Sequence, residues 1–301
     1  MNLSVNIGNS KFSNPVTVAS GTFAHAEKYY ALDEVRHLGA LIPKTVTWRR
    51  REGNPPPRIV ETPAGMLNAI GIDNPGVEGF ITQKLAALQK IGVPLIISIS
   101  GQSDDEFLQL VERIQDQKGV SALELNLSCP NLQHNILVAQ DPQATLRVVK
   151  KVKRVSSVPI IAKLSPNVTD ITQIALAAQD AGADAVSLIN TFTGMVIDVK
   201  KRKPVLGNLT GGLSGPAIRP VALAMVYKTA KAVKVPIVGM GGIMTAEDAL
   251  QFLIAGATMV AVGTANFVQP RAPLEILQGI KKYMKDNKMT DIRELIGSIK
   301  I

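Results

Sequence analysis

The hexapeptide Asn126-Leu127-Ser128-Cys129-Pro130-Asn131 follows a short apolar run, Ala122 to Leu125, that indicates a buried strand. Pro130 ends such a strand, because proline has no N–H to donate and its φ is fixed. Two asparagines, a serine and the only cysteine of the chain therefore gather where a strand stops, and barrel enzymes place their chemistry at such strand ends. The alternative is a capped strand followed by an inert thiol, since free cysteine usually behaves as a small buried hydrophobe.

Apolar runs of this kind recur, each followed by a segment with helical periodicity. They are Val16 to Ala19, Ala40 to Pro43, Pro94 to Ser100, Ala122 to Leu125, Pro159 to Ala162, Ala185 to Ile189, Pro236 to Gly239 and Met259 to Val262. Runs that are apolar throughout indicate parallel strands covered on both faces. Eight of them alternating with helices, over about 250–300 residues, predict an α/β fold of the (β/α)8 TIM-barrel type. The competing doubly wound sheet favours a glycine-rich turn after the first strand, where this chain has Ser20-Gly21-Thr22.

Helix starts and connections complete the predicted barrel. Ser103, Asp141 and Thr245 are N-cap residues, and Pro142 suits the first helical position. Val5 to Phe12, around Gly8-Asn9, predicts a hairpin that closes the floor of the barrel.

Two intervals are too long for simple crossovers. They are Lys44 to Gly76 and Asn190 to Gly215, both rich in glycine or proline and both leaving from the C-terminal ends of strands. Long loops inside a compact domain are usually functional. Because no linker divides the sequence, residues 1–301 are predicted to form a single domain with these long loops at its catalytic face.

Composition narrows the function classes. One cysteine among 301 residues excludes a disulfide framework, a Cys-only zinc site and an iron–sulfur cluster held by this chain, and it suits the cytoplasm. No uninterrupted apolar stretch is long enough to span a membrane, and Met1 to Ser10 lacks the layout of a signal peptide. The net charge of +9 is dispersed and aromatics make up only 4%, so we expect a solvated basic surface and neither a nucleic-acid nor a membrane partner.

Two glycine-rich turns end the last two predicted strands. They are Gly239-Met240-Gly241-Gly242-Ile243 and Gly263-Thr264-Ala265. Glycine lets backbone N–H groups approach an anion closely, and the loops after strands seven and eight are the usual phosphate site of a barrel. Two inert tight turns are the alternative, but the paired position favours a phosphate site that holds a mononucleotide cofactor over the barrel mouth.

Polar side chains stand at other strand ends. Lys44 and Lys163 each close an apolar strand, a costly position for a lysine unless it meets an anion or a polar ligand. Either one alone is equally consistent with a surface lysine. The amides of Asn68, Asn126, Asn131 and Asn190 suit a heterocycle with alternating C=O and N–H edges. We expect Lys44 to neutralise a substrate carboxylate.

Taken together, these motifs resemble the class 1 dihydroorotate dehydrogenases over nearly the whole chain. The matching stretches are Ala19-Ser20-Gly21-Thr22, Lys44-Thr45-Val46-Thr47, Gly53-Asn54-Pro55-Pro56-Pro57-Arg58, Asn68-Ala69-Ile70-Gly71, Asn126 to Asn131 and Gly239 to Ile243. Gly211 to Ile218, with the sequence GGLSGPAI, resembles subtype 1B, whose members pass electrons to NAD through a second subunit.

The resemblance implies FMN at the C-terminal mouth of the barrel and oxidation of dihydroorotate to orotate. Cys129 would be the base that removes the C5 proton, and Lys163 would stabilise negative charge on the reduced flavin. The FMN site would comprise Ser20, Lys44, Thr45, Asn126, Lys163, Ile189 and Gly215, with Gly241, Gly242, Gly263 and Thr264 at the phosphate. The substrate site would comprise Lys44, Asn68, Ala69, Ile70, Gly71, Ile72, Asn126, Asn190 and Thr191.

The resemblance also implies an assembly. In subtype 1B a homodimeric core joins a subunit that carries FAD and an iron–sulfur cluster, which makes a heterotetramer. Alternatives that keep the barrel are a fumarate-using subtype 1A homodimer, an FMN-dependent tRNA dihydrouridine synthase and a phosphate-binding barrel without catalysis. The chain departs from the family pattern at Ser98, where members carry an asparagine near the flavin, and in Leu132 to Gln140, which lacks the glycines found in members.

Overall fold

A parallel sheet forms the centre of the molecule. The computed structural model describes residues 1–23, 35–128, 130–131 and 136–300. Within them, seven parallel strands are ordered β3-β17-β16-β11-β10-β7-β6. Their bounds are β3 Val16–Val18, β6 Leu95–Ile99, β7 Val120–Asn126, β10 Ile160–Lys163, β11 Ala185–Leu188, β16 Ile237–Met240 and β17 Met259–Val262. The predicted alternation of buried strands and helices is confirmed for these seven runs, because their side chains are covered on both faces.

The predicted eighth strand, Ala40 to Pro43, is wrong in detail. Leu41 makes an isolated parallel bridge to Leu95, and Val46, just beyond the segment, makes another to Ile99, both on the β6 side. On its other side the Gly39 N–H donates to the Val16 carbonyl of β3 at 2.9 Å. Pro43 has no N–H to give to a ladder, so the pairing is interrupted there. The irregular segment still lies between β6 and β3 and closes the curled sheet into the predicted barrel type.

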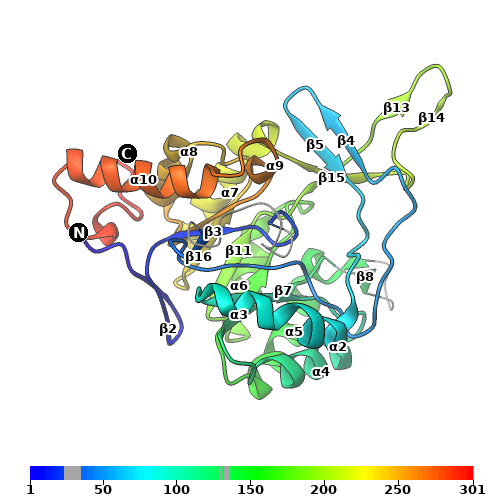
Figure 1. Cartoon of the computed structure of the whole chain (residues 1–301), viewed down its shortest axis with the longest axis horizontal. Coiled ribbons are helices and arrows are strands. Elements are labelled where there is room, and N and C mark those ends of the chain that lie inside the picture. Colours follow the sequence, from blue (N-terminus) through cyan, green and yellow to red (C-terminus); the bar gives the residue numbers. More distant parts are fainter. Residues whose placement is uncertain (24–34, 129, 132–135, 301) are drawn as a thin grey trace.

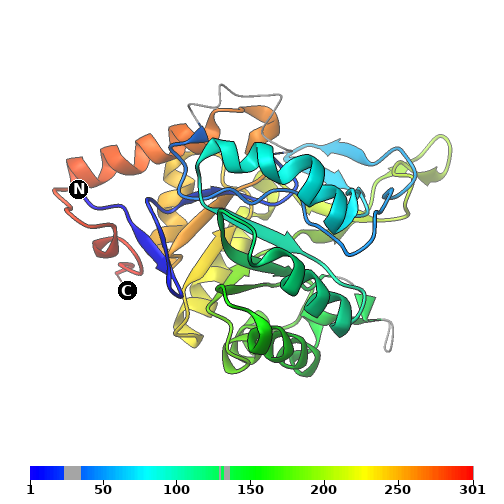
Figure 2. The same cartoon turned by 60° about the horizontal axis from the view of Figure 1, so that its bottom comes forward.

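Helices cover the outside of the sheet (Figures 1 and 2). They are α2 Gly76–Phe80, α3 Ala86–Ile91, α4 Asp104–Ile114, α5 Pro142–Val155, α6 Ile171–Asp180, α7 Arg219–Ala232, α8 Ala246–Ala255, α9 Ala265–Val268 and α10 Ala272–Asp286. A π-helical turn, Ile81–Leu85, joins α2 to α3. The predicted N-caps are confirmed, because Ser103, Asp141 and Thr245 accept from backbone N–H groups in the first turns of α4, α5 and α8.

The floor of the barrel is the predicted hairpin. β1 Val5–Ile7 pairs with β2 Ser10–Phe12 around Gly8, whose φ of 55° is in the left-handed region that glycine favours. The Ser10 hydroxyl donates to the Ser121 carbonyl at 2.6 Å, near the start of β7. Asn2 forms a bridge to Asp291, so both chain ends lie at this side of the molecule (Figure 1).

The sequence predicts long loops for the two long intervals. In the structure they instead form a second sheet together. β4 Ile59–Thr62 and β5 Gly65–Asn68 come from the first interval, and β12 Phe192–Gly194 and β15 Gly211–Ser214 come from the second. They form one antiparallel sheet in the order β12-β15-β5-β4, which we call the mouth sheet. Beyond it, β13 Ile197–Asp198 and β14 Lys203–Pro204 form an arm that projects from the molecule (Figure 1). The motif strand β8 Pro130–Asn131 pairs with β9 Ile136–Leu137.

The part of the chain that the structure describes also contains three single-turn 3-10 helices, at Val138–Gln140, Pro216–Ile218 and Ile292–Glu294. Among the described residues, none of the helices combines the length and the apolar character needed to cross a bilayer.

Candidate active site

A cavity of about 550 Å³ lies between the barrel mouth and the mouth sheet. Most of its lining follows directly on the parallel strands, because the carboxyl ends of parallel strands meet at one edge. Ser20 follows β3, Asn126 and Lys163 end β7 and β10, and Gly241 and Gly263 follow β16 and β17. The mouth sheet adds side chains from above, so residues from both halves of the sequence enclose the same space.

The structure brings nearly all of the predicted site residues to this cavity. Those that line it are Ser20, Lys44, Thr45, Asn68, Ile70, Gly71, Ile72, Asn126, Lys163, Ile189, Asn190, Thr191, Gly215, Gly241, Gly242, Gly263 and Thr264. Ala69 is not part of the lining, because it is buried with Leu67 and Leu206 in a small core of the mouth sheet. Cys129 lies outside the described residues, although its neighbours Asn126 and Ser128 line the cavity.

One end of the cavity is formed by backbone rather than side chains. Gly241 and Gly242 have φ values of 128° and 72°, in the left-handed region. A Cβ at either position would meet α7, at 2.6 Å from Ala222 Cβ or 2.7 Å from Arg219 Cβ. At Gly263, by contrast, a Cβ would come no closer than 3.7 Å to the surrounding protein atoms. The backbone at Gly263 therefore borders open space, as a cradle for an anionic group requires.

Thr264 and Ser214 add hydroxyl groups to this end. The Thr264 hydroxyl donates to Ser214 Oγ at 2.8 Å, which ties the end of β17 to β15 of the mouth sheet. Arg219 pairs with the buried carboxylate of Asp248, which also accepts from the Thr245 N–H at 3.0 Å. These contacts fix the backbone around the glycine turns, and backbone N–H groups with two hydroxyls suit a phosphate group.

Lys44 stands on another side of the cavity. Burial is the main cause that lowers the pKa of its ammonium below the ordinary value of 10.5. The carboxylate of Asp73 acts to raise this pKa, and the ammonium of Lys163 acts to lower it. A desolvated ammonium is stabilised by an anionic ligand, so Lys44 is suited to pair a carboxylate inside the cavity.

Lys163 is held from below by an acidic residue. Its Nζ donates to Glu124 Oε1 at 3.4 Å, and Ser187 Oγ donates to Glu124 Oε2 at 2.9 Å. The Glu124 side chain is fully buried and does not line the cavity, whereas Lys163 does. The ammonium thus reaches the cavity floor with a carboxylate underneath it.

The asparagine side chains form a linked set. Asn190 Nδ2 donates to Ser128 Oγ at 2.9 Å and to Asn126 Oδ1 at 3.4 Å. Asn190 Oδ1 accepts from the Thr191 N–H at 2.8 Å. On the mouth sheet, Asn68 Nδ2 donates to the Gly212 carbonyl at 3.3 Å. These bonds orient amide groups from β5, β7 and the segment after β11 around one space.

Ser98, where the chain departs from the family pattern, lies behind the cavity wall. It is fully buried, and its hydroxyl lies 3.0 Å from that of Thr45. The Thr45 hydroxyl lies 3.0 Å from that of Ser20, which in turn donates to the Pro43 carbonyl at 2.8 Å. Ser98 therefore contacts the cavity lining through Thr45, which in turn contacts Ser20.

Several lining residues were missed by the sequence analysis. Met66, Asp73, Ser128, Ser214 and Phe267 belong to the lining, and Glu124 supports it. Glu124 carried a usable signal, since a charged residue in the middle of an apolar strand needs a partner. Ser128 lies within the motif itself. Phe267, on the short helix α9, carried no signal, because an exposed aromatic after a glycine turn is common.

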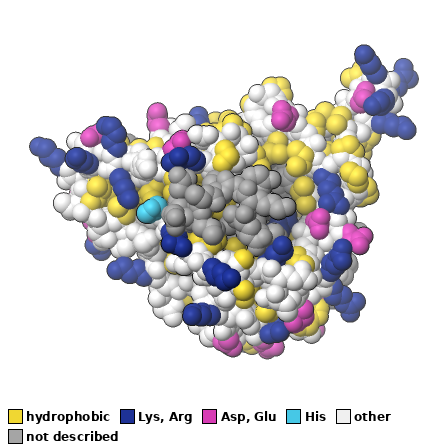
Figure 3. Space-filling view, in the orientation of Figure 1, with side chains coloured by type: hydrophobic (Ala, Val, Ile, Leu, Met, Phe, Trp, Pro, Cys, Tyr) yellow, Lys and Arg dark blue, Asp and Glu magenta, His cyan; other side chains and the backbone are white. Residues whose placement is uncertain are grey.

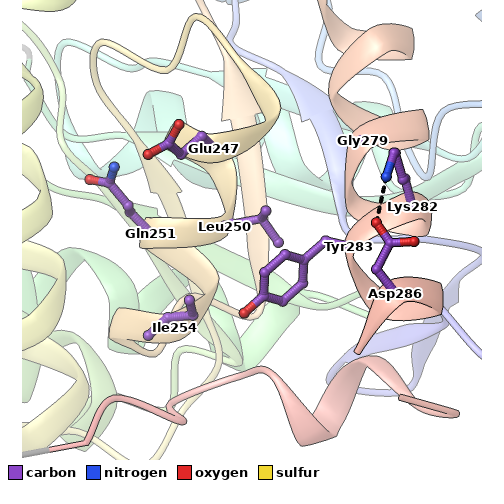
Figure 4. A pocket seen from close by; sticks show the side chains of 8 residues that line it. All are labelled: Glu247, Leu250, Gln251, Ile254, Gly279, Lys282, Tyr283 and Asp286. Atoms are coloured by element: carbon purple, nitrogen blue, oxygen red, sulfur yellow. Dashed lines mark hydrogen bonds and ion pairs between the residues drawn. The ribbon is translucent and has the colours of Figure 1, made fainter. Parts of the chain in front are cut away.

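A second hollow, of about 560 Å³, lies on the outer surface between α8 and α10. Figure 4 shows it, with Leu250 and Tyr283 facing one another and an ion pair between Lys282 and Asp286 at one side. It holds none of the predicted site residues, so it is separate from the cavity at the barrel mouth.

Basic side chains are spread over the surface as the sequence indicated. Figure 3 shows Lys and Arg scattered over one face, with a group at the tip of the projecting arm. That tip contains the exposed residues Lys200, Lys201, Arg202 and Lys203.

The chain is similar to known proteins over nearly its whole length. The family model described as dihydroorotate dehydrogenase matches residues 2–284. The chain is 50% identical over 298 residues to the "Dihydroorotate dehydrogenase B (NAD(+)), catalytic subunit" of Geotalea uraniireducens, with 99% of this chain and 98% of that protein covered. It is 50% identical over 301 residues to the protein of the same name from Lachnoclostridium phytofermentans, with 100% of both covered. The corresponding protein of Geotalea daltonii is 51% identical over 300 residues, covering 99% of this chain and 98% of that protein.

Proposed function

Because this chain belongs to the dihydroorotate dehydrogenase family, we propose that it is the catalytic subunit of an NAD+-linked enzyme that oxidises (S)-dihydroorotate to orotate in pyrimidine (UMP) biosynthesis. The chain is a flavin-dependent oxidoreductase, as members of the family are. The observation that carries the finer proposal is the cavity at the barrel mouth, in which a glycine cradle, two lysines and a set of amides come together.

FMN is the flavin that these residues fit. The open backbone at Gly263, the left-handed turn at Gly241 and Gly242, and the hydroxyl of Thr264 would hold its phosphate. Ser20, Lys44, Thr45, Asn126, Lys163, Ile189 and Gly215 would border the rest of it. When bound, FMN would supply the two-electron chemistry by accepting a hydride from C6 of dihydroorotate.

The substrate would lie between the flavin site and the mouth sheet. Lys44 would pair its carboxylate, and Asn68, Asn126 and Asn190 would orient the ring through amide hydrogen bonds. The pocket would be completed by Ile70, Gly71, Ile72 and Thr191. Ala69 does not line it and would only position the backbone of its neighbours. This arrangement would fix C5 and C6 of the ring for reaction.

Cys129 would remove the proton from C5. The assignment rests on the motif, since Cys129 itself lies outside the described residues. Its described neighbours Asn126 and Ser128 border the substrate side of the cavity. Lys163 would stabilise the negative charge that the reduced cofactor gains.

The chain would work with a partner subunit that transfers electrons, in keeping with the phrase "catalytic subunit" in the relatives' names. The single cysteine cannot ligate an iron–sulfur cluster, so that cluster and FAD would belong to the partner. We propose a homodimeric core of two 301-residue, single-domain chains joined by two partners as a heterotetramer in the cytoplasm.

The cofactor assignment can be tested on the purified chain alone. We expect a yellow protein with about one FMN per chain, no iron, and reduction of its flavin by dihydroorotate. Stoichiometric iron, or activity in colourless protein, would overturn the proposal. Turnover with fumarate in place of NAD+ and the partner would instead support the subtype 1A alternative.

Gly263→Ala tests the phosphate cradle specifically. The added methyl has room in the protein, with Ala19 Cβ at 3.7 Å, but it would enter the space assigned to the phosphate. We expect an unchanged melting temperature of the FMN-free protein together with at least tenfold weaker FMN binding. Wild-type FMN affinity in Gly263→Ala would place the phosphate elsewhere.

A further inference from the structure

We propose that Glu124 is a positioning residue that holds the Lys163 ammonium at the cavity floor and limits how far this charge can stabilise the reduced cofactor. This inference rests on the proposed function, because it concerns the role of Lys163 toward the flavin. Glu124 itself does not line the cavity, so it acts through Lys163.

The contacts of Glu124 are specific. Its carboxylate is fully buried, and each oxygen accepts from a different side chain. Oε1 accepts from Lys163 Nζ at 3.4 Å, and Oε2 accepts from Ser187 Oγ at 2.9 Å. A buried carboxylate is costly unless it is paired and hydrogen-bonded. Its place inside an otherwise apolar strand therefore calls for an explanation beyond packing.

The strand register explains why these three side chains meet. Lys163 on β10 pairs with Asn126 on β7 and with Ser187 on β11. Glu124 lies two residues before Asn126 on the same strand, so its side chain points to the same face one layer deeper. The side chain at the end of β10 thus has a carboxylate beneath it and a hydroxyl beside it.

The charge balance around Lys163 gives Glu124 its effect. Lys44 faces Lys163 from the segment after Gly39, and the two ammonium groups repel. The carboxylate of Asp73, in the segment after β5, acts to raise the pKa of Lys44. The thiol of Cys129 is a further titratable group, in the motif that follows β7. Of the described carboxylates, only Glu124 has a hydrogen bond to Lys163. It therefore offsets the repulsion from Lys44 and fixes the position of the Lys163 side chain.

Glu124→Gln removes the charge and keeps the shape. The variant amide can still accept from Ser187, but Lys163 becomes a buried ammonium next to Lys44 without an anion. While Lys163 remains protonated, its uncompensated charge favours the reduced cofactor. As the pH rises, Lys163 loses its proton in the variant and this advantage disappears.

The measurement is the equilibrium between oxidised and reduced FMN in the loaded protein, followed spectroscopically against a redox standard from pH 6 to pH 9.5. In Glu124→Gln we expect that equilibrium to shift toward the reduced form by about tenfold at pH 6, or about 30 mV for a two-electron couple. We expect the shift to vanish in a step at higher pH. Because Lys44 and Cys129 also titrate beside the cavity, the step is read as the difference between Glu124→Gln and the wild type. It should be absent from the difference between the double variant Glu124→Gln/Lys163→Gln and Lys163→Gln.

Three further variants separate positioning from packing. Glu124→Asp keeps the charge and should restore the wild-type pH profile. Asp184→Asn removes a carboxylate from another ion pair, with Lys153 at the opposite end of the barrel, and should leave the equilibrium unchanged. If Glu124→Gln does not fold, Ser187→Ala serves instead. It removes the hydroxyl that shares the carboxylate charge, so more of that charge faces Lys163, and the equilibrium should shift a few-fold toward the oxidised form.

The inference is overturned if Glu124→Gln shows the wild-type pH profile or if the step persists in the double variant. Where Glu124→Gln cannot be made, it is overturned if Ser187→Ala shows no shift. Failure of the proposed function looks different. In that case the wild-type chain would bind no FMN, or dihydroorotate would not reduce it.

Discussion

Cys129 is the residue on which the proposed proton transfer depends. A thiol at its ordinary pKa of about 8.5 is mostly protonated at neutral pH, and only the thiolate can accept the C5 proton. The rate of flavin reduction by dihydroorotate should therefore rise with pH until the thiolate fraction saturates. Cys129→Ser should slow this reduction by about 10²–10⁴-fold, because serine is a much weaker base.

Stopped-flow reduction of bound FMN provides the measurement for Cys129→Ser. Orotate binding and reduction by an artificial reductant serve as controls, and both should survive, since Asn68, Asn126 and Asn190 hold the ring independently. If the variant reduces its flavin at the wild-type rate, Cys129 is an inert packed thiol, the alternative that the sequence left open.

Lys44 makes orotate binding depend on pH. Burial lowers its pKa below 10.5, so the free protein loses the Lys44 proton at a lower pH than an exposed lysine does. A bound carboxylate favours the charged form, and binding above the lowered pKa must take up a proton. Orotate affinity should thus be constant at lower pH and fall as the pH rises through this pKa.

Lys44→Ala should weaken orotate binding by about 1–3 kcal/mol and remove this pH dependence, because a carboxylate in the cavity loses its partner. Isothermal titration calorimetry on protein with measured FMN content tests both effects, with the exposed Lys118→Ala as the matched control. Unchanged orotate affinity in FMN-loaded Lys44→Ala contradicts the assignment.

At the scale of elements, the mouth sheet couples two distant segments. Gly212 of β15 pairs with Asn68 of β5, so the two sides of the substrate pocket share one set of ladder bonds. Gly65, at the start of β5, approaches the Ser214 carbonyl so closely that an added Cβ would lie at 2.1 Å from that oxygen. A backbone atom cannot turn aside as a side chain does, so the strands must move apart.

Gly65→Ala should therefore lower orotate affinity by roughly tenfold, or about 1.4 kcal/mol. The melting temperature should change little, because this hairpin lies outside the barrel core. Glu61→Ala, on the exposed part of the same hairpin, is the control and should bind orotate normally. An equal loss of orotate affinity in both variants would mean that any substitution in the hairpin weakens binding. The close contact at Gly65 would then not be the cause.

The elements also show what the sequence could and could not predict. Seven barrel strands were predictable because a parallel strand buried on both faces is mostly apolar and does not alternate. The segment at Ala40 to Pro43 looked like the others, but Pro43 breaks its ladder. The mouth sheet was not predictable, since its strands are short and half-exposed and their partners lie far apart in sequence. Site residues at strand ends could be predicted from the sequence. The role of Glu124 could not, because it depends on which strands are neighbours in the sheet.

At the scale of the whole molecule, the elements that close the barrel and the elements that form the candidate site lie on opposite sides. The floor hairpin and both termini lie at one side, and the mouth sheet and the projecting arm lie at the other (Figure 1). A fusion at either terminus is therefore remote from the cavity. We expect an N-terminal fusion to retain FMN binding, as a flavin absorbance titration would check, and a loss of binding would argue against this division.

The pairing of β3 with β17 has a consequence for synthesis on the ribosome. Val16 emerges early, yet its partner Val260 is among the last residues of the barrel to be made. At about 5–20 residues per second, the first strand waits on the order of ten seconds or more with one edge open. Nascent chains stalled before residue 259 should be cut by protease near β3, and chains released past residue 301 should resist. We therefore expect chaperones to bind the nascent chain until β17, in the last seventh of the sequence, has been made.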